Sequence, residues 1–125
     1  MKTIVVADDE DFLRLLVKET LDRYRVIEAR DGDEAIALVR ESAPDLLILD
    51  WMMPGRDGPA VLELLRADPA TRDLPILMVT AKLGTPERAR LLAAGATACL
   101  PKPFGTAALR ASVEQVFAKS AEPTS

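Results

Sequence analysis

The sequence predicts an α/β fold, a doubly wound parallel sheet of five strands in the order 2-1-3-4-5. Five short apolar segments alternate with stretches whose apolar residues recur every three or four positions, as expected of five βα units. The third segment, Leu46 to Leu49, is apolar without alternation, which is typical of a central strand covered on both faces. Candidate site residues follow every segment except the second, which ends in Ala29-Arg30, contributes nothing comparable and therefore suits an edge position.

The first half of the chain contains two strand–helix units before the central strand. Thr3 to Ala7 is a β-branched run and predicts the first strand, while Arg25 to Ala29 predicts the second. Each is followed by a stretch with helical periodicity, so two helices are expected there. The periodic apolar positions are Phe12, Leu13, Leu16, Val17 and Leu21 in the first helix, and Ala35, Ile36, Leu38 and Val39 in the second.

Proline and glycine mark the helices of the second half. Gly58-Pro59 and Thr85-Pro86 each begin a helix, because proline suits the first helical position. Gly95 provides a left-handed end for the second of these helices. Pro75 to Val79 predicts the fourth strand and Ala98 to Leu100 a weak fifth. The apolar positions are Val61, Leu62 and Leu65 in the third helix, and Leu109, Val113, Val116 and Phe117 in the last.

Composition limits the domain organisation and excludes several functions. With 125 residues, 49% of them hydrophobic, the chain suits one core, so we expect one domain over residues 1–119 and a disordered tail over 120–125. A net charge of -4 without a basic block disfavours direct nucleic-acid binding. No segment resembles a signal peptide or a membrane span, and we expect a cytoplasmic protein. One cysteine excludes an internal disulfide, and without histidine any metal should be held by oxygen.

Ionisable and polar residues gather at strand ends that should meet at one edge of the sheet. Asp8-Asp9 follows the first strand, Asp50 the third, Thr80 the fourth and Lys102 the fifth. Carboxylates crowded together either take up protons or gather a cation, and a hard ion such as Mg²⁺ is the natural partner. A carboxylate can also attack phosphorus as a nucleophile. The transferred phosphoryl group would then need a metal, an ammonium group and hydrogen-bond donors, and Lys102 and Thr80 supply the last two.

Each of these residues also has an ordinary structural interpretation. Asp8 and Asp9 could cap the following helix, and Asp50 could be a plain strand exit. Thr80 could be a β-branched strand end, and Lys102 a solvated charge. All of these interpretations would have to hold at once, so the set as a whole favours a site.

Four motifs, VVADDE, LLILDWMMPGRDG, ILMVTA and LPKPF, have the order and approximate spacing of response regulator receiver domains. Over residues 1 to 119 the chain resembles this family, and specifically its stand-alone members in chemotaxis and phosphorelay systems. The resemblance implies a flavodoxin-like (βα)5 fold and a role in two-component signal transduction. It implies that Asp50 accepts a phosphoryl group from a histidine kinase or histidine phosphotransfer protein, with Mg²⁺ required. Such a domain assists its own phosphorylation and dephosphorylation but is not an enzyme acting on another substrate.

The resemblance also implies a metal-ligand set. Asp9 would bind Mg²⁺ directly and Asp8 through water, beside Asp50. The backbone carbonyl of Met52 would complete the protein ligands, which leaves the side chain at that position unconstrained.

Roles for the remaining residues, and for one surface, follow from the same resemblance. Thr80 and Lys102 would contact phosphoryl oxygens, and the Lys102-Pro103 peptide would be cis. Because no DNA-binding or catalytic segment follows residue 119, we expect the signal to leave through binding of a downstream protein. The surface expected for that contact comprises the fourth helix, the fifth strand and the fifth helix.

Two departures from the family pattern predict distinct behaviour. Cys99 stands where receivers generally have a tyrosine or phenylalanine, and a thiol cannot fill the space of a rotating ring. We therefore expect coupling through the loop from Thr80 to Thr85 and the following helix, with Cys99 as a small core residue the alternative. Met52 offers no acid or amide to orient water, and Lys82 could contact phosphate or point into solvent. These residues predict slow self-dephosphorylation.

Three other functions are weighed against this one. A phosphohydrolase of the haloacid dehalogenase type needs a second aspartate two residues after the nucleophile, where this chain has Met52. A flavodoxin-like cofactor carrier needs a phosphate-binding loop after the first strand, whereas ADDED repels an anionic cofactor. A pseudo-receiver, acting only as an interaction module, would not be expected to keep all five polar positions.

Overall fold

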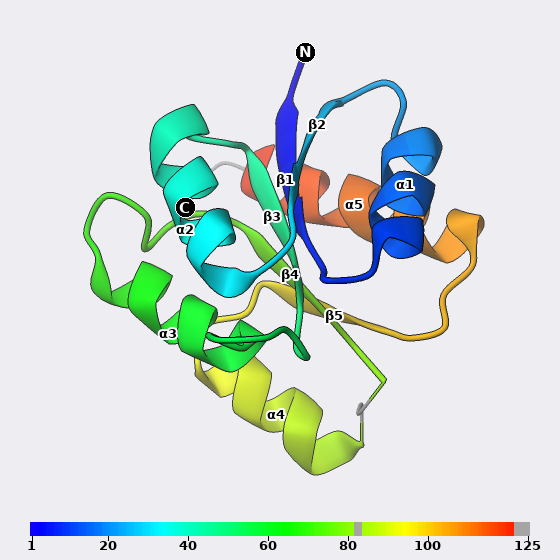
Figure 1. Cartoon of the computed structure of the whole chain (residues 1–125). Coiled ribbons are helices and arrows are strands. Elements are labelled where there is room, and N and C mark those ends of the chain that lie inside the picture. Colours follow the sequence, from blue (N-terminus) through cyan, green and yellow to red (C-terminus); the bar gives the residue numbers. More distant parts are fainter. Residues whose placement is uncertain (82–83, 122–125) are drawn as a thin grey trace.

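Strands and helices alternate along residues 1–81 and 84–121, the part of the chain that the computed structural model describes (Figure 1). The strands are β1 (Thr3–Ala7), β2 (Arg25–Ala29), β3 (Leu46–Asp50), β4 (Ile76–Thr80) and β5 (Ala98–Pro101). The helices are α1 (Asp11–Thr20), α2 (Gly32–Ser42), α3 (Gly58–Ala67), α4 (Thr85–Ala93) and α5 (Thr106–Ala121). Every predicted element is present, and β3, β4 and β5 each end one residue later than predicted.

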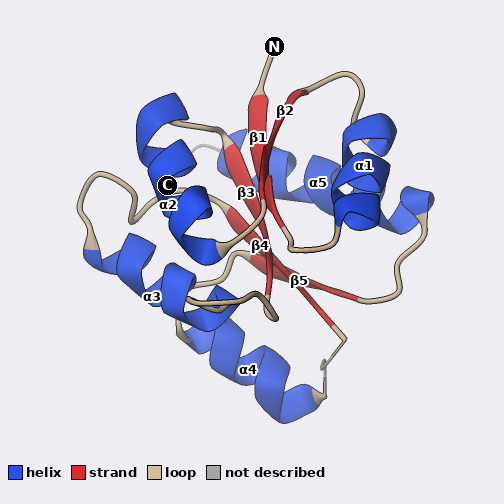
Figure 2. Ribbon diagram, in the orientation of Figure 1, coloured by secondary structure: helices blue, strands red, loops and turns tan. Residues whose placement is uncertain are grey.

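The strands form one parallel sheet in the order β2-β1-β3-β4-β5, which confirms the predicted topology. Their carboxyl ends are nearly in register: Ala7 pairs with Leu49, Asp50 with Val79, and Thr80 with Pro101. Residues that follow different strands therefore lie at the same edge of the sheet. Figure 2 shows this sheet running between two layers of helices.

Each face of the sheet carries its own core. On one face Val5, Leu47 and Leu49 pack with the buried sides of α2, α3 and α4, and on the other Ile4 and Ile48 pack with α1 and α5. Every residue of β3 is buried, as expected of a central strand. Burying one leucine or isoleucine side chain stabilises the fold by about 2 kcal/mol, so the two cores hold the strand ends rigidly.

Helix starts follow the local sequence. Pro59 and Pro86 lie in the first turns of α3 and α4, as predicted. Asp31 and Asp57 cap α2 and α3, since their side chains accept backbone N–H groups of the first turn at 2.8 and 3.0 Å. Gly95, just after α4, has a φ of 113°, which confirms the predicted left-handed end.

The structure departs from the sequence prediction in α1 and at the carboxyl end. Phe12, counted with the apolar stripe of α1, is 72% exposed, whereas Arg14 in the same helix is only 6% exposed. Helix α5 runs to Ala121, two residues into the segment predicted as a disordered tail, and residues 122–125 lie outside the described part. Among the helices that the structure describes, none has the length and hydropathy of a membrane span.

Candidate functional site

The predicted residues converge at the carboxyl edge of the sheet. Asp8 directly follows β1, Asp50 ends β3 and Thr80 ends β4, and these residues are only 5%, 4% and 1% exposed. Lys102, one residue after β5, places its ammonium 3.0 Å from Asp8 Oδ2 and 3.2 Å from Asp50 Oδ1. Two buried carboxylates from different strands therefore share one cation.

The end of β4 holds the backbone of Lys102 in place. Its backbone N–H donates to the carbonyl oxygen of Thr80 at 2.9 Å. The next peptide, Lys102-Pro103, is cis, which confirms that prediction. The ends of β4 and β5 thus place the lysine beside the threonine.

Burial and like charge perturb the ionisation of this site. Burial, with the charge of Asp8, raises the pKa of Asp50 from 3.8 to about 6, against the opposing effect of Lys102 and a backbone N–H of Met52. Burial alone would lower the pKa of Lys102, but its contacts with Asp8 and then Asp50 outweigh burial and raise it. At neutral pH Asp50 is therefore largely ionised and Lys102 is a cation.

Asp8, Asp9 and Glu10 form an acidic cluster in which one carboxylate oxygen from each lies within 4.8 Å of the others. Asp9 and Glu10 are exposed, so an ion can approach from solvent. The donors are all hard oxygens, which fit Mg²⁺ or a similar divalent cation. Sequence reasoning did not include Glu10, although its place in ADDED was the available signal. Asp50 is linked to this cluster through Lys102 and Asp8.

The loop after β3 folds back onto the end of that strand. The N–H of Gly58 donates to the carbonyl of Trp51 at 2.8 Å, and a Cβ at position 58 would come within 2.4 Å of the Asp50 carbonyl oxygen. Glycine is therefore required for this close approach. The backbone of Met52 lies against the Asp50 carboxylate, to which its N–H donates, while its side chain is 62% exposed. The role of its carbonyl as a metal ligand stays a prediction.

Arg14, which sequence reasoning missed, supports the acidic cluster from behind. Its Nη1 donates to the backbone carbonyl of Asp8 at 2.6 Å and its Nε to Glu28 Oε1 at 3.2 Å, and Nη2 pairs with Asp11. We expected no comparable contribution from the second strand, yet Glu28 of β2 anchors this arginine. The available signal was a lone arginine inside the apolar stretch FLRLLV.

The family model of the response regulator receiver domain matches residues 4–114. The chain belongs to this family. The phosphate regulon transcriptional regulatory protein PhoB of Rhizobium meliloti is 41% identical to this chain over 119 residues, which are 94% of this chain. The response regulator PleD of Caulobacter vibrioides is 40% identical over 116 residues, which are 92% of this chain. The structure of this chain matches the chemotaxis response regulator CheY4 of Vibrio cholerae with a TM-score of 0.88 at 31% identity, covering 93% of this chain and 98% of that one.

The chain matches different shares of these three proteins. The receiver domain spans 52% of the length of that PhoB protein and 26% of PleD, so the likeness concerns a part of each. It covers nearly the whole of CheY4, which has the same flavodoxin-like fold. The chain is therefore a receiver domain of two-component systems, whose members work between histidine kinases and downstream targets.

Cys99 of the receiver domain lies on β5, half-buried against the core on the α3 and α4 side. Burial raises the pKa of its thiol, although the charge of Arg88 on α4 acts the other way. This environment fits the alternative in which Cys99 is a small core residue. Lys82 lies outside the described residues, and so does part of the loop from Thr80 to Thr85 proposed for coupling.

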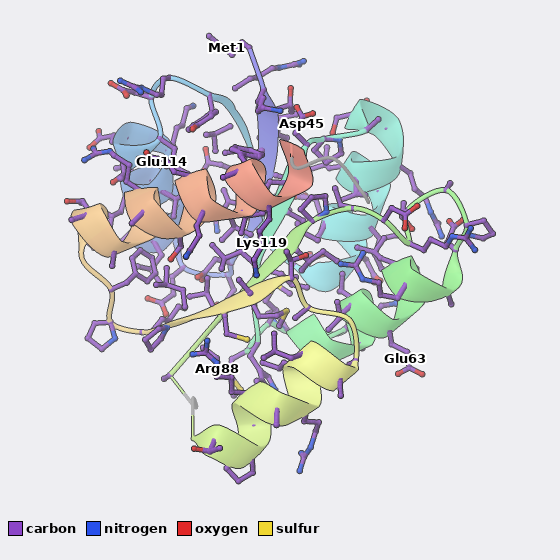
Figure 3. All side chains as sticks on the ribbon, turned by 180° about the vertical axis from the view of Figure 1, so that it is seen from behind. Met1, Asp45, Glu63, Arg88, Glu114 and Lys119 are labelled. Carbon is purple, nitrogen blue, oxygen red and sulfur yellow. The ribbon has the colours of Figure 1, made fainter. Side chains whose placement is uncertain are left out.

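Two hollows lie at opposite edges of the receiver domain. A cavity of about 320 Å³ beside the site is lined by Phe12, Leu13, Leu16, Ala81, Lys102, Pro103 and Phe104. A larger groove of about 980 Å³ lies at the amino edge of the sheet, and Asp45 and Lys119, labelled in Figure 3, line it. None of the predicted site residues lines the larger groove, whereas Lys102 lines the smaller, mainly apolar hollow and links it to the site.

Proposed function

We propose that Asp50 accepts a phosphoryl group from a histidine kinase or histidine phosphotransfer protein in a Mg²⁺-dependent reaction. The phosphorylated domain would then bind a downstream protein. The observation that carries this proposal is the buried Asp50 carboxylate at the centre of the carboxyl edge, 3.2 Å from the Lys102 ammonium. Membership of the receiver family supports the same assignment.

In the proposed step an oxygen of Asp50 attacks phosphorus while the P–N bond to the donor histidine breaks. The imidazole leaves with the electron pair of that bond, and Asp50 becomes an aspartyl phosphate. Attack requires an ionised carboxylate, and with a pKa of about 6 Asp50 is ionised at neutral pH. Lys102 and Thr80, at adjacent strand ends, would contact the phosphoryl oxygens.

Mg²⁺ would be held by Asp9 directly, by Asp8 through water, by Asp50 and by the backbone carbonyl of Met52. The hard oxygen donors of the acidic cluster support this choice of metal. When bound, the ion supplies positive charge that reduces the repulsion between an anionic donor and the carboxylates.

The domain would act as a phosphoryl acceptor that assists its own phosphorylation and dephosphorylation, and not as an enzyme with a separate substrate. The exposed, apolar side chain of Met52 cannot orient an attacking water, so we propose that self-dephosphorylation is slow. Replacing Met52→Asn should shorten the lifetime of the phosphorylated form. An unchanged lifetime would argue against this assignment.

Apolar surface beside the site suits a protein donor. Phe12 and Leu15 on α1 are 72% and 52% exposed, and Phe12 also lines the hollow next to Lys102. Large exposed apolar side chains gathered on one face are typical of a protein interaction site. We propose that the upstream partner contacts this face while its phosphohistidine reaches Asp50.

Output is proposed through the face formed by α4, β5 and α5, in the cytoplasm and without direct contact to nucleic acid. On α4 Leu92 is 42% exposed and Arg88 is also exposed, which supports a mixed contact surface there. Because Cys99 cannot act as a rotating ring, the signal would reach this face through the loop after Thr80 and through α4. Amide exchange with and without beryllofluoride tests this route, and unchanged exchange over residues 81–95 would remove it.

The fluorescence of Trp51 tests the phosphorylation proposal, because this only tryptophan directly follows Asp50. Mg²⁺ followed by acetyl phosphate should change the emission in two steps. Asp50→Asn should abolish the phosphate step while retaining the fold, as judged by circular dichroism. A wild-type protein that shows no phosphate step at saturating donor would instead be a pseudo-receiver, a pure interaction module.

A further inference from the structure

We propose that Arg14 is a positioning residue of the metal site. It holds the peptide between Asp8 and Asp9 and thereby aims the carboxylate of Asp9 at the ion. This inference rests on the proposed Mg²⁺ site and assigns a residue that supports it from outside the ligand set.

The guanidinium of Arg14 joins three segments of the chain. It donates to the Asp8 carbonyl of the loop after β1 at 2.6 Å and to Glu28 of β2 at 3.2 Å, and it pairs with Asp11 at the start of α1. The side chain is only 7% exposed, whereas Asp11 is 90% exposed. An arginine is rarely buried to this extent unless its donors are used, and here they bind the acidic loop to the sheet.

Backbone geometry explains why this contact reaches Asp9. The Asp8 carbonyl and the Asp9 nitrogen belong to one planar peptide, so holding the oxygen fixes the direction in which the chain enters Asp9. The other side of Asp8 is fixed as well, because its N–H donates to the carbonyl of Ala29 at 3.1 Å. Asp9 is exposed, and the structure records no side-chain hydrogen bond for it among the described residues. Its direction therefore depends on this peptide.

The Asp8 carboxylate has separate supports. Its Oδ1 accepts the N–H of Glu10 at 2.9 Å and its Oδ2 accepts from Lys102 at 3.0 Å. Loss of Arg14 should therefore disturb Asp9 more than the Asp8 carboxylate. Lysine cannot replace the arginine fully, because a single ammonium does not present the fixed fork of donors that reaches the Asp8 carbonyl and Glu28 together.

Positioning and simple charge make opposite predictions. If Arg14 acted only as a cation near the acidic cluster, its removal would strengthen Mg²⁺ binding by relieving repulsion between like charges. If it positions the peptide, its removal weakens binding although a repelling charge is lost. Replacing a residue that holds a metal ligand in place typically lowers metal affinity by tenfold or more. We therefore expect the Mg²⁺ affinity of Arg14→Met to be roughly tenfold lower than that of the wild type.

The test is a Mg²⁺ titration followed by Trp51 fluorescence, at a temperature where circular dichroism shows every variant folded. Wild type, Arg14→Met, Arg14→Lys and the control Lys18→Met are compared. Lys18 lies on the same helix and is exposed, so its removal deletes a cation without touching the loop. We expect weak binding in Arg14→Met, intermediate binding in Arg14→Lys, and binding within about twofold of wild type in the control.

The outcomes separate this inference from the proposed function. If the wild type does not bind Mg²⁺, the proposed metal site is wrong. If the wild type binds and Arg14→Met binds equally or more tightly, only the positioning role is overturned, and Arg14 serves stability alone. Should Arg14→Met fail to fold, Glu28→Gln loosens the same anchor from β2. Wild-type affinity in both Glu28→Gln and Arg14→Lys would then overturn the inference.

Discussion

The two edges of the sheet handle charge in opposite ways. At the carboxyl edge Asp8 and Asp50 are buried and share Lys102. At the amino edge Arg40 and Asp68 form a looser pair at 3.6 Å with side chains 55% and 30% exposed. The charged side chains at the amino edge stay partly exposed to water, whereas the two carboxylates at the carboxyl edge are buried.

This difference shows which charges serve the fold alone. Taking a carboxylate out of water is unfavourable unless a partner compensates, and replacing buried ion pairs by apolar residues is often neutral or stabilising. Ionised Asp50 destabilises the fold, because burial and the charge of Asp8 raise its pKa to about 6. An unfavourable buried carboxylate of this kind is the pattern expected where residues serve the proposed function at a cost in stability.

The substitution Lys102→Met should have the largest effect on stability of the changes at either edge. It leaves two buried carboxylates without their shared cation, and we expect a loss of about 3 to 4 kcal/mol of unfolding free energy at pH 7. The loss should shrink near pH 5, where Asp50 takes up a proton, and also in excess Mg²⁺, which restores positive charge. Urea unfolding under these three conditions measures the effect, and equal losses in all three would contradict the electrostatic explanation.

Gly58→Ala should have the next largest effect. Its Cβ would lie 2.4 Å from the Asp50 carbonyl oxygen and 2.8 Å from the Trp51 Cα, both backbone atoms that cannot move aside easily. We expect destabilisation of about 3 kcal/mol and a shifted Trp51 emission. Gly105→Ala is the matched control, because a Cβ at this position would have no described atom within 4 Å beyond the residue itself and its two chain neighbours. Similar unfolding curves for the two variants would show that the loop does not need this close approach.

Asp50→Asn should act in the opposite direction. The folded pKa of about 6 lies above the ordinary 3.8, so ionisation of Asp50 destabilises the fold as pH rises through 6. A neutral amide avoids this penalty, which the pKa difference puts at about 3 kcal/mol. Because the pKa of about 6 already includes the attraction of Lys102, we expect the whole of this gain, about 3 kcal/mol, at pH 7 without Mg²⁺. Urea unfolding should show the gain vanishing by pH 4, and a gain independent of pH would point to another cause.

Arg40→Met at the amino edge should have the smallest effect. Its pair with Asp68 is long and partly exposed to solvent, so we expect a change in unfolding free energy within about 0.5 kcal/mol of wild type. Phosphorylation by acetyl phosphate should also be unchanged. A loss comparable to that of Lys102→Met would mean that the two edges do not differ as described.

Local sequence was sufficient for the strands, their order and the residues at their ends. Asp50 and Thr80 could be placed together because consecutive βα units align the carboxyl ends of parallel strands. Periodicity alone could not predict that Phe12 would be exposed and Arg14 buried. Helical spacing identifies a face, but Arg14 is buried because the Asp8 carbonyl, in the loop after β1, and Glu28 of β2 supply acceptors for its donors. Such contacts exist only after the chain has folded.

Intact-mass spectrometry after incubation with Mg²⁺ and acetyl phosphate tests the central claim, that the carboxyl edge is built to phosphorylate Asp50. We predict that the wild type gains the mass of one phosphoryl group. Asp50→Asn, and wild type with the metal chelated, should both remain unmodified. A wild-type protein that stays unmodified at saturating donor, or an Asp50→Asn variant that is modified equally, would contradict the claim.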